Sequence, residues 1–188
     1  MTLRGDVVIT GDGGTSHALQ AVGEASGKPT VAQALAETLP RAARVRGDLF
    51  RRMIVSGRED YTPDPSPEAT AQLRLRHRLS AAAADAYAEA GFTAVVQDVL
   101  LGPELASYVE LIRTRPLHVV VLAPSPETVA AREAGRPKTG YGVWTVADLD
   151  AGLRTGTAPL GLWLDTSELT VEQTVEAILY GTERSRVA

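Results

Sequence analysis

Glycine and lysine residues near the start of the chain have the chemistry to bind phosphate. The residues that could contact phosphate oxygens are Gly23, Ser26, Gly27, Lys28 and Thr30. They approximate a phosphate-binding loop, in which a glycine is followed by four residues and then by Gly-Lys-Ser/Thr. Glycines allow backbone N–H groups to curl around a phosphate, and the lysine neutralises its outer oxygens. The spacing departs from this pattern, because Gly23 is one residue too close to Gly27.

A second departure concerns magnesium. Pro29 stands where the loop pattern has a hydroxyl, and proline also lacks a backbone N–H. Thr30 can supply the missing hydroxyl as a metal ligand if the loop shifts by one residue. The alternative interpretation is that residues 27–30 form only a turn and a helix start.

Two aspartates follow predicted strands, a position from which they could act on a substrate or a metal. Asp48 comes after Ala43–Arg46, and Asp98 comes directly after Thr93–Gln97. Beside a phosphate loop, Asp48 could accept the proton of a substrate hydroxyl. Asp98 could bind magnesium or its water shell. The alternatives are that Asp48 caps the next helix and that Asp98 only begins a loop.

Two arginine pairs could contact anionic groups. Arg51 and Arg52 could bind substrate, and Arg132 and Arg136 lie four residues apart, on one face of a helix. Guanidinium groups in such positions stabilise charge on a phosphoryl group during transfer. For each arginine taken alone, ordinary surface basicity is the favoured interpretation.

Other polar segments give weaker indications. Asp165 and Thr166, after the last predicted strand, could contact a nucleotide base or could cap the final helix. The basic cluster at 74–78 is interpreted as a solvated helix face. The polar tail after Gly181 is expected to fray.

The elements that position these residues are short apolar runs alternating with helical segments. The predicted strands are Asp6–Thr10, Ala43–Arg46, Thr93–Gln97, His118–Leu122 and Leu160–Leu164. The predicted helices cover about 29–39, a short segment from 48, 68–90, 103–113, 126–135, 146–153 and 170–179. Strands that are apolar throughout indicate an α/β fold with a parallel sheet covered on both faces. Ligands of such sheets bind beyond the carboxyl ends of the strands.

Length and composition restrict the function further. The chain of 188 residues is interpreted as one domain, 1–188, with a formal net charge of −4. The absence of cysteine excludes disulfides, thiolate metal sites and cysteine nucleophiles. An acidic chain is a poor non-specific nucleic-acid binder, and no apolar segment is long enough for a membrane span. We therefore expect a cytoplasmic protein that binds neither nucleic acid nor a membrane; a small-molecule partner is implied by the resemblance described next.

Taken together, several segments resemble the small P-loop kinases of the chloramphenicol phosphotransferase-like, gluconate kinase-like and shikimate kinase-like group. The segments that carry the resemblance are 27–37, 45–54, 95–98, 131–136, 164–167 and 170–179. The resemblance implies a three-layer P-loop NTPase-like fold with a five-stranded parallel sheet and a short lid at about 133–145. It also implies ATP and Mg²⁺ as cofactors, with Thr30 and Asp98 at the metal.

The activity implied by the resemblance is transfer of the terminal phosphoryl group of ATP to a hydroxyl of a sugar-like or antibiotic-like molecule. Lys28 then matches the phosphate-loop lysine, Asp48 the base, and Arg132 and Arg136 the arginines of the lid. The second hypothesis is a nucleotide- or anion-binding protein that has lost catalysis because of Pro29 and the altered loop.

Overall fold

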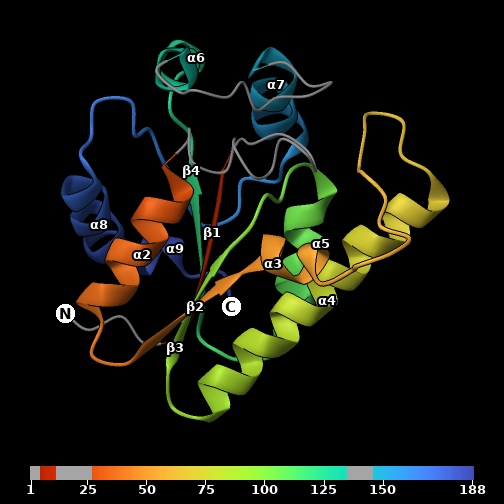
Figure 1. The fold of residues 1–188 in the computed structure, drawn as a ribbon. Coiled ribbons are helices and arrows are strands. Elements are labelled where there is room, and N and C mark those ends of the chain that lie inside the picture. The colour runs from red at the N-terminus through yellow and green to blue at the C-terminus, as the bar shows by residue number, and fades with distance from the viewer. Residues whose placement is uncertain (1–4, 12–26, 135–145) are drawn as a thin grey trace.

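The computed structural model describes residues 5–11, 27–134 and 146–188. Its centre is a parallel sheet of five strands in the order β2-β3-β1-β4-β5 (Figure 1). The strands are β1 (Asp6–Gly11), β2 (Ala42–Arg46), β3 (Thr93–Gln97), β4 (Leu117–Leu122) and β5 (Leu162–Leu164). The predicted parallel α/β architecture is therefore confirmed.

Helices cover both faces of the sheet and complete three layers. The helices are α2 (Lys28–Thr38), α3 (Gly47–Arg52), α4 (Pro67–Glu89), α5 (Pro103–Leu111), α6 (Pro126–Ala134), α7 (Val146–Gly156), α8 (Val171–Tyr180) and α9 (Thr182–Ser185). On one face, α2 and α8 pack against β1, and on the other α4 and α5 do so (Figure 1).

The central strands are apolar on both sides because both sides are covered. Val7 and Ile9 of β1 belong to the core under α2 and α8, whereas Val8 between them belongs to the core under α4 and α5. Successive side chains of a strand point to opposite faces. A run without alternation therefore marks a strand buried between two helical layers, and every residue of β4 is buried.

Helix α4 begins and ends where the sequence predicts, but two of its polar side chains are not solvated. Ser66 accepts a hydrogen bond from the backbone N–H of Ala69 at 2.9 Å, and Pro67 occupies the first turn. The prediction of a solvated basic face is wrong for Arg76 and His77, which are 3% and 2% exposed. The reason lies in their distant partners, described below.

The carboxyl-terminal tail is ordered, so the prediction that it frays is wrong. Residues 182–185 form α9, and the backbone N–H of Val187 donates to the carbonyl of Leu117 at 3.0 Å. The N–H of Leu117 in turn donates to the carbonyl of Ala188 at 2.9 Å. Ser185 is fully buried and lies 3.0 Å from Nδ1 of His118. Polar residues are buried here because their hydrogen bonds are satisfied.

Several element boundaries differ from the sequence-based expectation by one to three residues, those of β5 and α7 among them. Strand β5 begins at Leu162 rather than Leu160, because Gly161 has φ of 72° and a Cβ there would lie 2.2 Å from the carbonyl oxygen of Val119. Helix α7 continues to Gly156. The predicted lid at 133–145 starts in the last residues of α6, and the rest lies outside the described residues. Within the described part of the chain, no helix has the length and apolar character to cross a membrane.

Candidate functional site

The start of α2 carries the residues predicted to bind phosphate. Gly27 is the N-cap with φ of 79° and ψ of −2°, a left-handed conformation that glycine adopts without a Cβ penalty. Lys28 opens the helix and is fully buried, which is uncommon for lysine outside a polar environment. Thr30 lies two residues further on, in the first turn of α2, and is exposed. Gly23 and Ser26 lie outside the described residues.

Pro29 is compatible with this helix start. It occupies the first turn, where backbone N–H groups have no helical acceptor, so the helix loses no hydrogen bond. A phosphate at this position would have one N–H donor fewer than in the usual loop. The local structure thus preserves the glycine turn, the helix N-terminus and the lysine, and lacks one amide.

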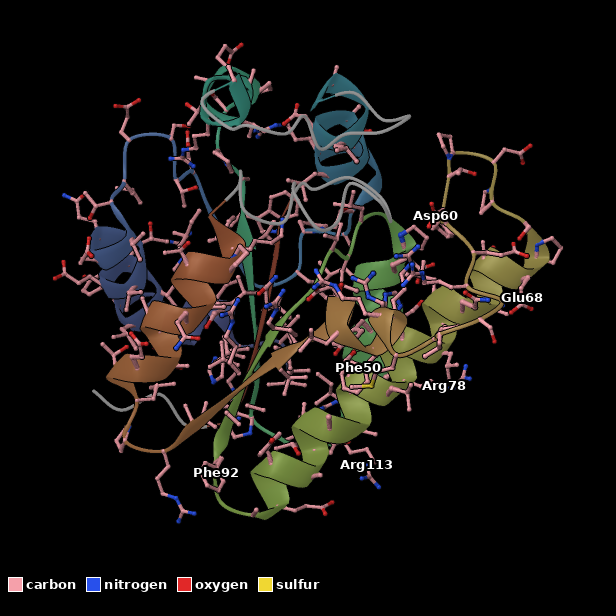
Figure 2. All side chains as sticks on the ribbon, in the orientation of Figure 1. Phe50, Asp60, Glu68, Arg78, Phe92 and Arg113 are labelled. Atoms are coloured by element: carbon pink, nitrogen blue, oxygen red, sulfur yellow. The ribbon has the colours of Figure 1, made fainter. Side chains whose placement is uncertain are left out.

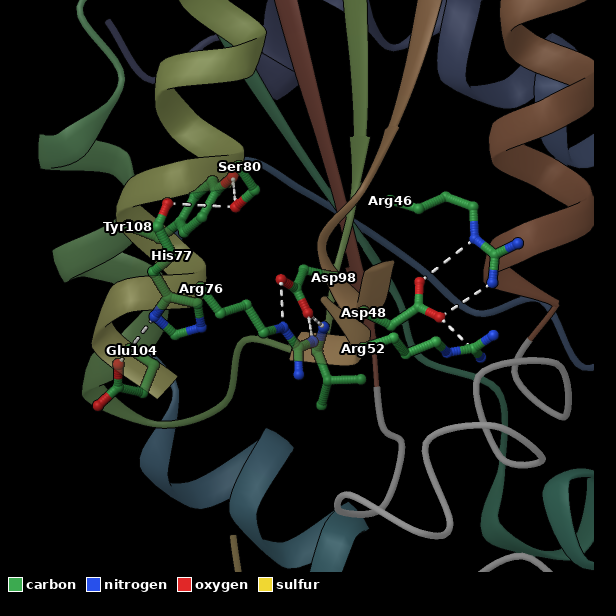
Figure 3. A network of polar contacts seen from close by, with 10 residues as sticks. Arg46, Asp48, Arg52, Arg76, His77, Ser80, Asp98, Glu104 and Tyr108 are labelled. Carbon is green, nitrogen blue, oxygen red and sulfur yellow. Dashed lines mark hydrogen bonds and ion pairs between the residues drawn. The ribbon is translucent and has the colours of Figure 1, made fainter. Parts of the chain in front are cut away.

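Asp48 lies at the carboxyl end of β2 between two arginines (Figure 3). Its Oδ1 accepts from Nε of Arg46 at 3.2 Å, and its Oδ2 accepts from Nη2 of Arg46 at 2.9 Å. Nη2 of Arg52 also lies 3.0 Å from Oδ2. Asp48 does not cap α3, whose N-cap is Arg46. The carboxylate therefore has one bidentate arginine partner and a second arginine that makes a single contact.

Asp98 forms a buried ion pair with Arg76 of α4. Nε of Arg76 donates to Oδ2 of Asp98 at 3.1 Å, and Nη2 contacts Oδ1 (Figure 3). The backbone N–H of Val99 donates to Oδ1 at 2.7 Å. Burial lowers the pKa of Arg76 to about 10, so the guanidinium remains charged at neutral pH. This pair fastens α4 to the end of β3.

Gly47 lets the two aspartates come together. A Cβ on Gly47 would lie 1.8 Å from Oδ2 of Asp98, so only glycine leaves room for the carboxylate. Asp48 follows directly, at the first turn of α3. The structure thus brings both predicted acidic residues to one edge of the sheet.

The described side chains do not form an evident magnesium site. Both oxygens of Asp98 already have partners, and within the described ranges there is no group of three or more His, Asp or Glu residues suited to a metal. The pairing with Arg76 argues against direct coordination by Asp98. The metal roles of Asp98 and Thr30 stay predictions.

Arg51 points toward a neighbouring segment rather than toward Asp48. It pairs with Asp60, which lies in the connection between α3 and α4 (Figure 2). Burial is the main reason that the pKa of Arg51 is lowered, and the nearby cations Arg58 and Arg52 lower it further. Of the two predicted substrate arginines, Arg52 is therefore the one that contacts Asp48.

The ends of β4 and β5 bring three other predicted residues together. Nη2 of Arg132 donates to the carbonyl of Thr166 at 2.9 Å and to that of Ser167 at 3.3 Å. Asp165 accepts from the backbone N–H of Ser167 at 2.9 Å. Helix α8 is capped by Thr170 instead, so the capping alternative for Asp165 is wrong. Arg136 lies outside the described residues.

Thr166 has an unusual environment. The residue is 4% exposed, and its Oγ1 has no hydrogen-bond partner among the described residues. An unpaired buried hydroxyl costs free energy. A ligand group that hydrogen-bonds this oxygen would remove the cost, which fits the predicted contact with a nucleotide.

Sequence reasoning missed three arginines of this edge. Arg44 and Arg46 lie two residues apart on β2, a spacing that places side chains on one face of a strand and could have indicated a shared role. Arg44 donates to the side-chain oxygens of Gln97 at 2.7 Å and Gln33 at 3.0 Å. The role of Arg76 had no local signal, because its partner is 22 positions away.

A second polar network lies behind this edge, between α4 and α5 (Figure 3). Nδ1 of His77 is 3.3 Å from Oε2 of Glu104, and this contact lowers the pKa of Glu104. The His77 ring meets Tyr108 edge-on at 5.5 Å, and the Tyr108 hydroxyl lies 2.9 Å from Oγ of Ser80. The network fixes the two helices that flank the Arg76–Asp98 pair.

The topology and the glycine-lysine helix start define an α/β protein of the P-loop NTPase-like class. Residues 23–157 match the family model described as an AAA domain, so the chain belongs to that family. A search of curated protein sequences finds no significant match.

Solved structures show the same fold. A sugar kinase from Janibacter sp. HTCC2649 is 19% identical, with a TM-score of 0.67 over 96% of this chain and 95% of that chain. A gluconokinase from Sinorhizobium meliloti 1021 is 20% identical, with a TM-score of 0.62 over 98% and 94%. An APS kinase from Mycobacterium tuberculosis, in complex with AMPPNP and APS, is 17% identical, with a TM-score of 0.64 over 96% and 98%. These likenesses confirm the predicted resemblance to the small kinases.

Proposed function

We propose that the protein transfers the terminal phosphoryl group of ATP to a hydroxyl of a small molecule. The observation that carries the proposal is the start of α2, where the left-handed Gly27 is followed by the fully buried Lys28. This arrangement suits a polyphosphate, because the helix N-terminus and the lysine both favour negative charge. The fold is shared with structures of small-molecule kinases.

For the nucleotide, we assign the phosphates to the loop before α2 and the base to the ends of β4 and β5. Gly23, Ser26, Gly27, Lys28 and Thr30 are the proposed phosphate contacts. The buried hydroxyl of Thr166 supports a contact with the nucleotide at the opposite end, with Arg132 and Asp165 beside it. Mg²⁺ bound with the nucleotide would supply charge neutralisation on the phosphates.

For the transfer itself, we assign Asp48 as the base that accepts the proton of the acceptor hydroxyl. The hydroxyl oxygen forms the new bond to the terminal phosphorus, the bond from that phosphorus to the bridging oxygen breaks, ADP leaves, and the hydroxyl proton passes to Asp48. The guanidinium groups of Arg46 and Arg52 hold the Asp48 carboxylate in place at the end of β2. We assign the stabilisation of negative charge on the transferring phosphoryl group to Lys28, Arg132 and Arg136.

The alternative function is nucleotide or anion binding without catalysis. Pro29 supports it, because it removes one amide from the proposed phosphate nest, and so does the occupation of both Asp98 oxygens. The two functions differ in product formation and in the response to magnesium. Binding that is indifferent to magnesium, without any phosphorylated product, favours the alternative.

The test is a product assay with ATP, Mg²⁺ and a panel of sugars, sugar acids and hydroxylated antibiotics. We expect a phosphorylated product with the wild type and none above background with Lys28→Met, which keeps the length of the side chain and removes its charge. Arg78→Met is the matched control, since Arg78 points outward from α4 (Figure 2) and is exposed. Failure of the whole panel in the wild type, or full activity in Lys28→Met, would contradict the proposal.

A further inference from the structure

Helix α4 presents apolar side chains to solvent along one line of its surface. Leu75 is 37% exposed and Leu79 is 42% exposed, and Ala82 and Ala86 further along the helix are exposed as well. Spacings of four, three and four residues place these side chains in one line, as in the seam of a coiled coil. The opposite side of α4 carries buried alanines of the core, and the helix lies on the outside of the molecule (Figure 1).

Exposed apolar side chains also occur on the element that adjoins α4. Helix α3 packs against α4, and Leu49 of α3 is exposed, as are Met53 and Val55 directly after it. The segment that follows is fastened to the first part of α4, because Nε2 of Gln72 donates to the carbonyl of Gly57 at 2.8 Å. Single exposed apolar residues are ordinary on protein surfaces, whereas a group of them on two adjoining helices indicates an interaction surface.

The order of large and small side chains along α4 fits a second copy of the same helix. When two α4 helices run antiparallel about a two-fold axis between Leu79 and Ala82, Leu79 faces the partner's Ala82. In the same register, Leu75 faces the partner's Ala86. Each large side chain then meets a small one, and each pair occurs twice, as a two-fold interface requires. A parallel arrangement would instead place leucine against leucine and leave a gap between facing alanines.

Charges along one side of this line also favour the antiparallel arrangement. Arg74 and Arg78 are exposed in the first half of α4. Near its end, the carboxylates of Asp85 and Glu89 share the single guanidinium of Arg113, so negative charge is in excess there. An antiparallel pair brings the arginines of each copy to the acidic end of the other, whereas a parallel pair brings arginine against arginine. Opposite charges beside an apolar seam determine the partner and its orientation.

We propose that this face of α4 binds a second copy of the chain and forms an antiparallel two-fold dimer. Leu75 and Leu79 supply the central apolar contacts, and Arg74 with Glu89 supplies the charged pair beside them. Removal of the leucines from water stabilises the dimer, and the charges fix its orientation. The inference is independent of the proposed phosphotransfer, because it uses no residue of the phosphate-binding segment and not Asp48.

The first test is sedimentation equilibrium of the full chain over about 1–200 μM, since the affinities of protein interfaces range from micromolar upwards. We expect the wild type to dimerise, and Leu79→Ala and Ala82→Leu each to weaken the dimer at least about tenfold. The double variant restores association, because a large side chain again faces a small one. Both positions are exposed in the single chain, so the substitutions leave its core intact. Tyr180→Ala, at an exposed aromatic residue of α8, is the control and dimerises as the wild type does.

The second test reports the orientation by disulfide formation, which the chain allows because it contains no cysteine. Leu75→Cys and Ala86→Cys variants, one of them tagged, are mixed and oxidised. A disulfide requires close approach of the two backbones, so the mixed dimer should form faster than the dimer of either variant with itself. Equal rates for the three pairings, or a preference for identical pairs, would contradict the antiparallel arrangement.

A wild type that stays monomeric over the whole concentration range overturns the inference. A dimer that neither Leu79→Ala nor Ala82→Leu weakens overturns it as well, because the interface then lies elsewhere. A monomer that instead sediments with vesicles of anionic phospholipid, and loses this binding when Arg74 and Arg78 are changed to glutamine, would assign the face to a membrane surface and contradict the proposal.

Discussion

At the scale of single residues, the candidate site is a set of acids held by arginines. Asp48 and Asp98 lie at the ends of neighbouring strands, and each contacts guanidinium groups, yet their surroundings differ. Arg76 and Asp98 are buried almost completely, whereas Arg46 and Arg52 reach solvent above Asp48. Removing one partner of a buried pair leaves an uncompensated charge. Asp98 is therefore assigned to the fold, and Asp48 is the acid that we propose for the substrate.

The first prediction concerns Asp48→Asn, which keeps the side-chain shape and removes the charge. Loss of a general base typically lowers the rate by about 10²- to 10⁴-fold, and we expect kcat to fall within this range. Affinity for ATP stays unchanged, because the ion pairs of Asp48 among the described residues are with Arg46 and Arg52 and not with the phosphate-binding segment. Steady-state kinetics and nucleotide titration measure the two effects. A kcat within threefold of wild type, about 0.7 kcal/mol, would show that Asp48 takes no proton.

The second prediction concerns Gly47→Ala. The new methyl group would collide with Asp98, at 1.8 Å from Oδ2, and would push the carboxylate away from Arg76. Overpacking of this kind costs about 1–3 kcal/mol in the free energy of unfolding, which denaturant titration measures. Gly152→Ala in α7 is the matched control, because the nearest atom to its new Cβ, on Leu101, is 3.9 Å away. The control should be neutral or slightly stabilising, since alanine favours a helix; equal loss in both variants would rule out the collision.

At the scale of elements, polar side chains decide how α4 sits against the sheet. Arg76 ties its middle to β3, and Asp85 ties its later part to the connection between α5 and β4. Asp85 accepts from the backbone N–H groups of Arg113 at 3.0 Å and Thr114 at 2.9 Å, and from Nε of Arg113 at 3.0 Å. The long helix is thus anchored at two points that its apolar pattern does not reveal.

The third prediction is a pH effect at Asp85. Burial raises its pKa, but hydrogen bonds from Thr114 and Arg113 outweigh burial, so the net pKa is below the usual value. The ionised form therefore stabilises the fold above about pH 4, the unfolded value, and this contribution is lost as the pH falls toward the folded pKa. Asp85→Asn should cost about 1–3 kcal/mol at pH 7.

The difference between Asp85→Asn and wild type in the free energy of unfolding should shrink below pH 4, as measured by denaturant titration across pH. Glu89→Gln is the control, since the contact of Glu89 with Arg113 at 3.5 Å is exposed on both sides, and it should change stability by less than about 0.5 kcal/mol. A difference for Asp85→Asn that is constant from pH 7 to pH 3 would contradict the assigned ionisation.

At the scale of the whole molecule, the fold was more readable from the sequence than the site. Apolar strands such as Leu117–Leu122 indicate a sheet covered on both sides, because a strand that is buried on both faces needs an apolar residue at nearly every position. The local sequence around a charged residue does not show which distant residue it pairs with. Arg76 looks solvated in a helix with arginines around it, and only the folded chain brings it to Asp98. The prediction that the carboxyl-terminal tail frays was wrong for the same reason, because Ser185 contacts His118, which is 67 positions away in the sequence.

The fourth prediction follows from that tail. Deleting residues 182–188 removes the two backbone hydrogen bonds to Leu117 and the contact of Ser185 with His118. At about 1 kcal/mol for each bond, the free energy of unfolding should fall by about 2–4 kcal/mol. Thermal and denaturant unfolding measure it. Tyr180→Ser, at a side chain that is 93% exposed, should leave stability nearly unchanged; a deletion as stable as this control would mean that the tail packs without consequence.

The fifth prediction addresses the central claim, that Lys28 and the start of α2 bind a polyphosphate. The measurement is calorimetric titration of the non-hydrolysable analogue AMPPNP into the wild type, Lys28→Met and the control Arg78→Met, with Mg²⁺ present. We expect the wild type and the control to bind with equal affinity and Lys28→Met to bind at least about tenfold more weakly, because a charge-assisted contact to phosphate is lost. No binding to the wild type, or undiminished binding to Lys28→Met, would contradict the account.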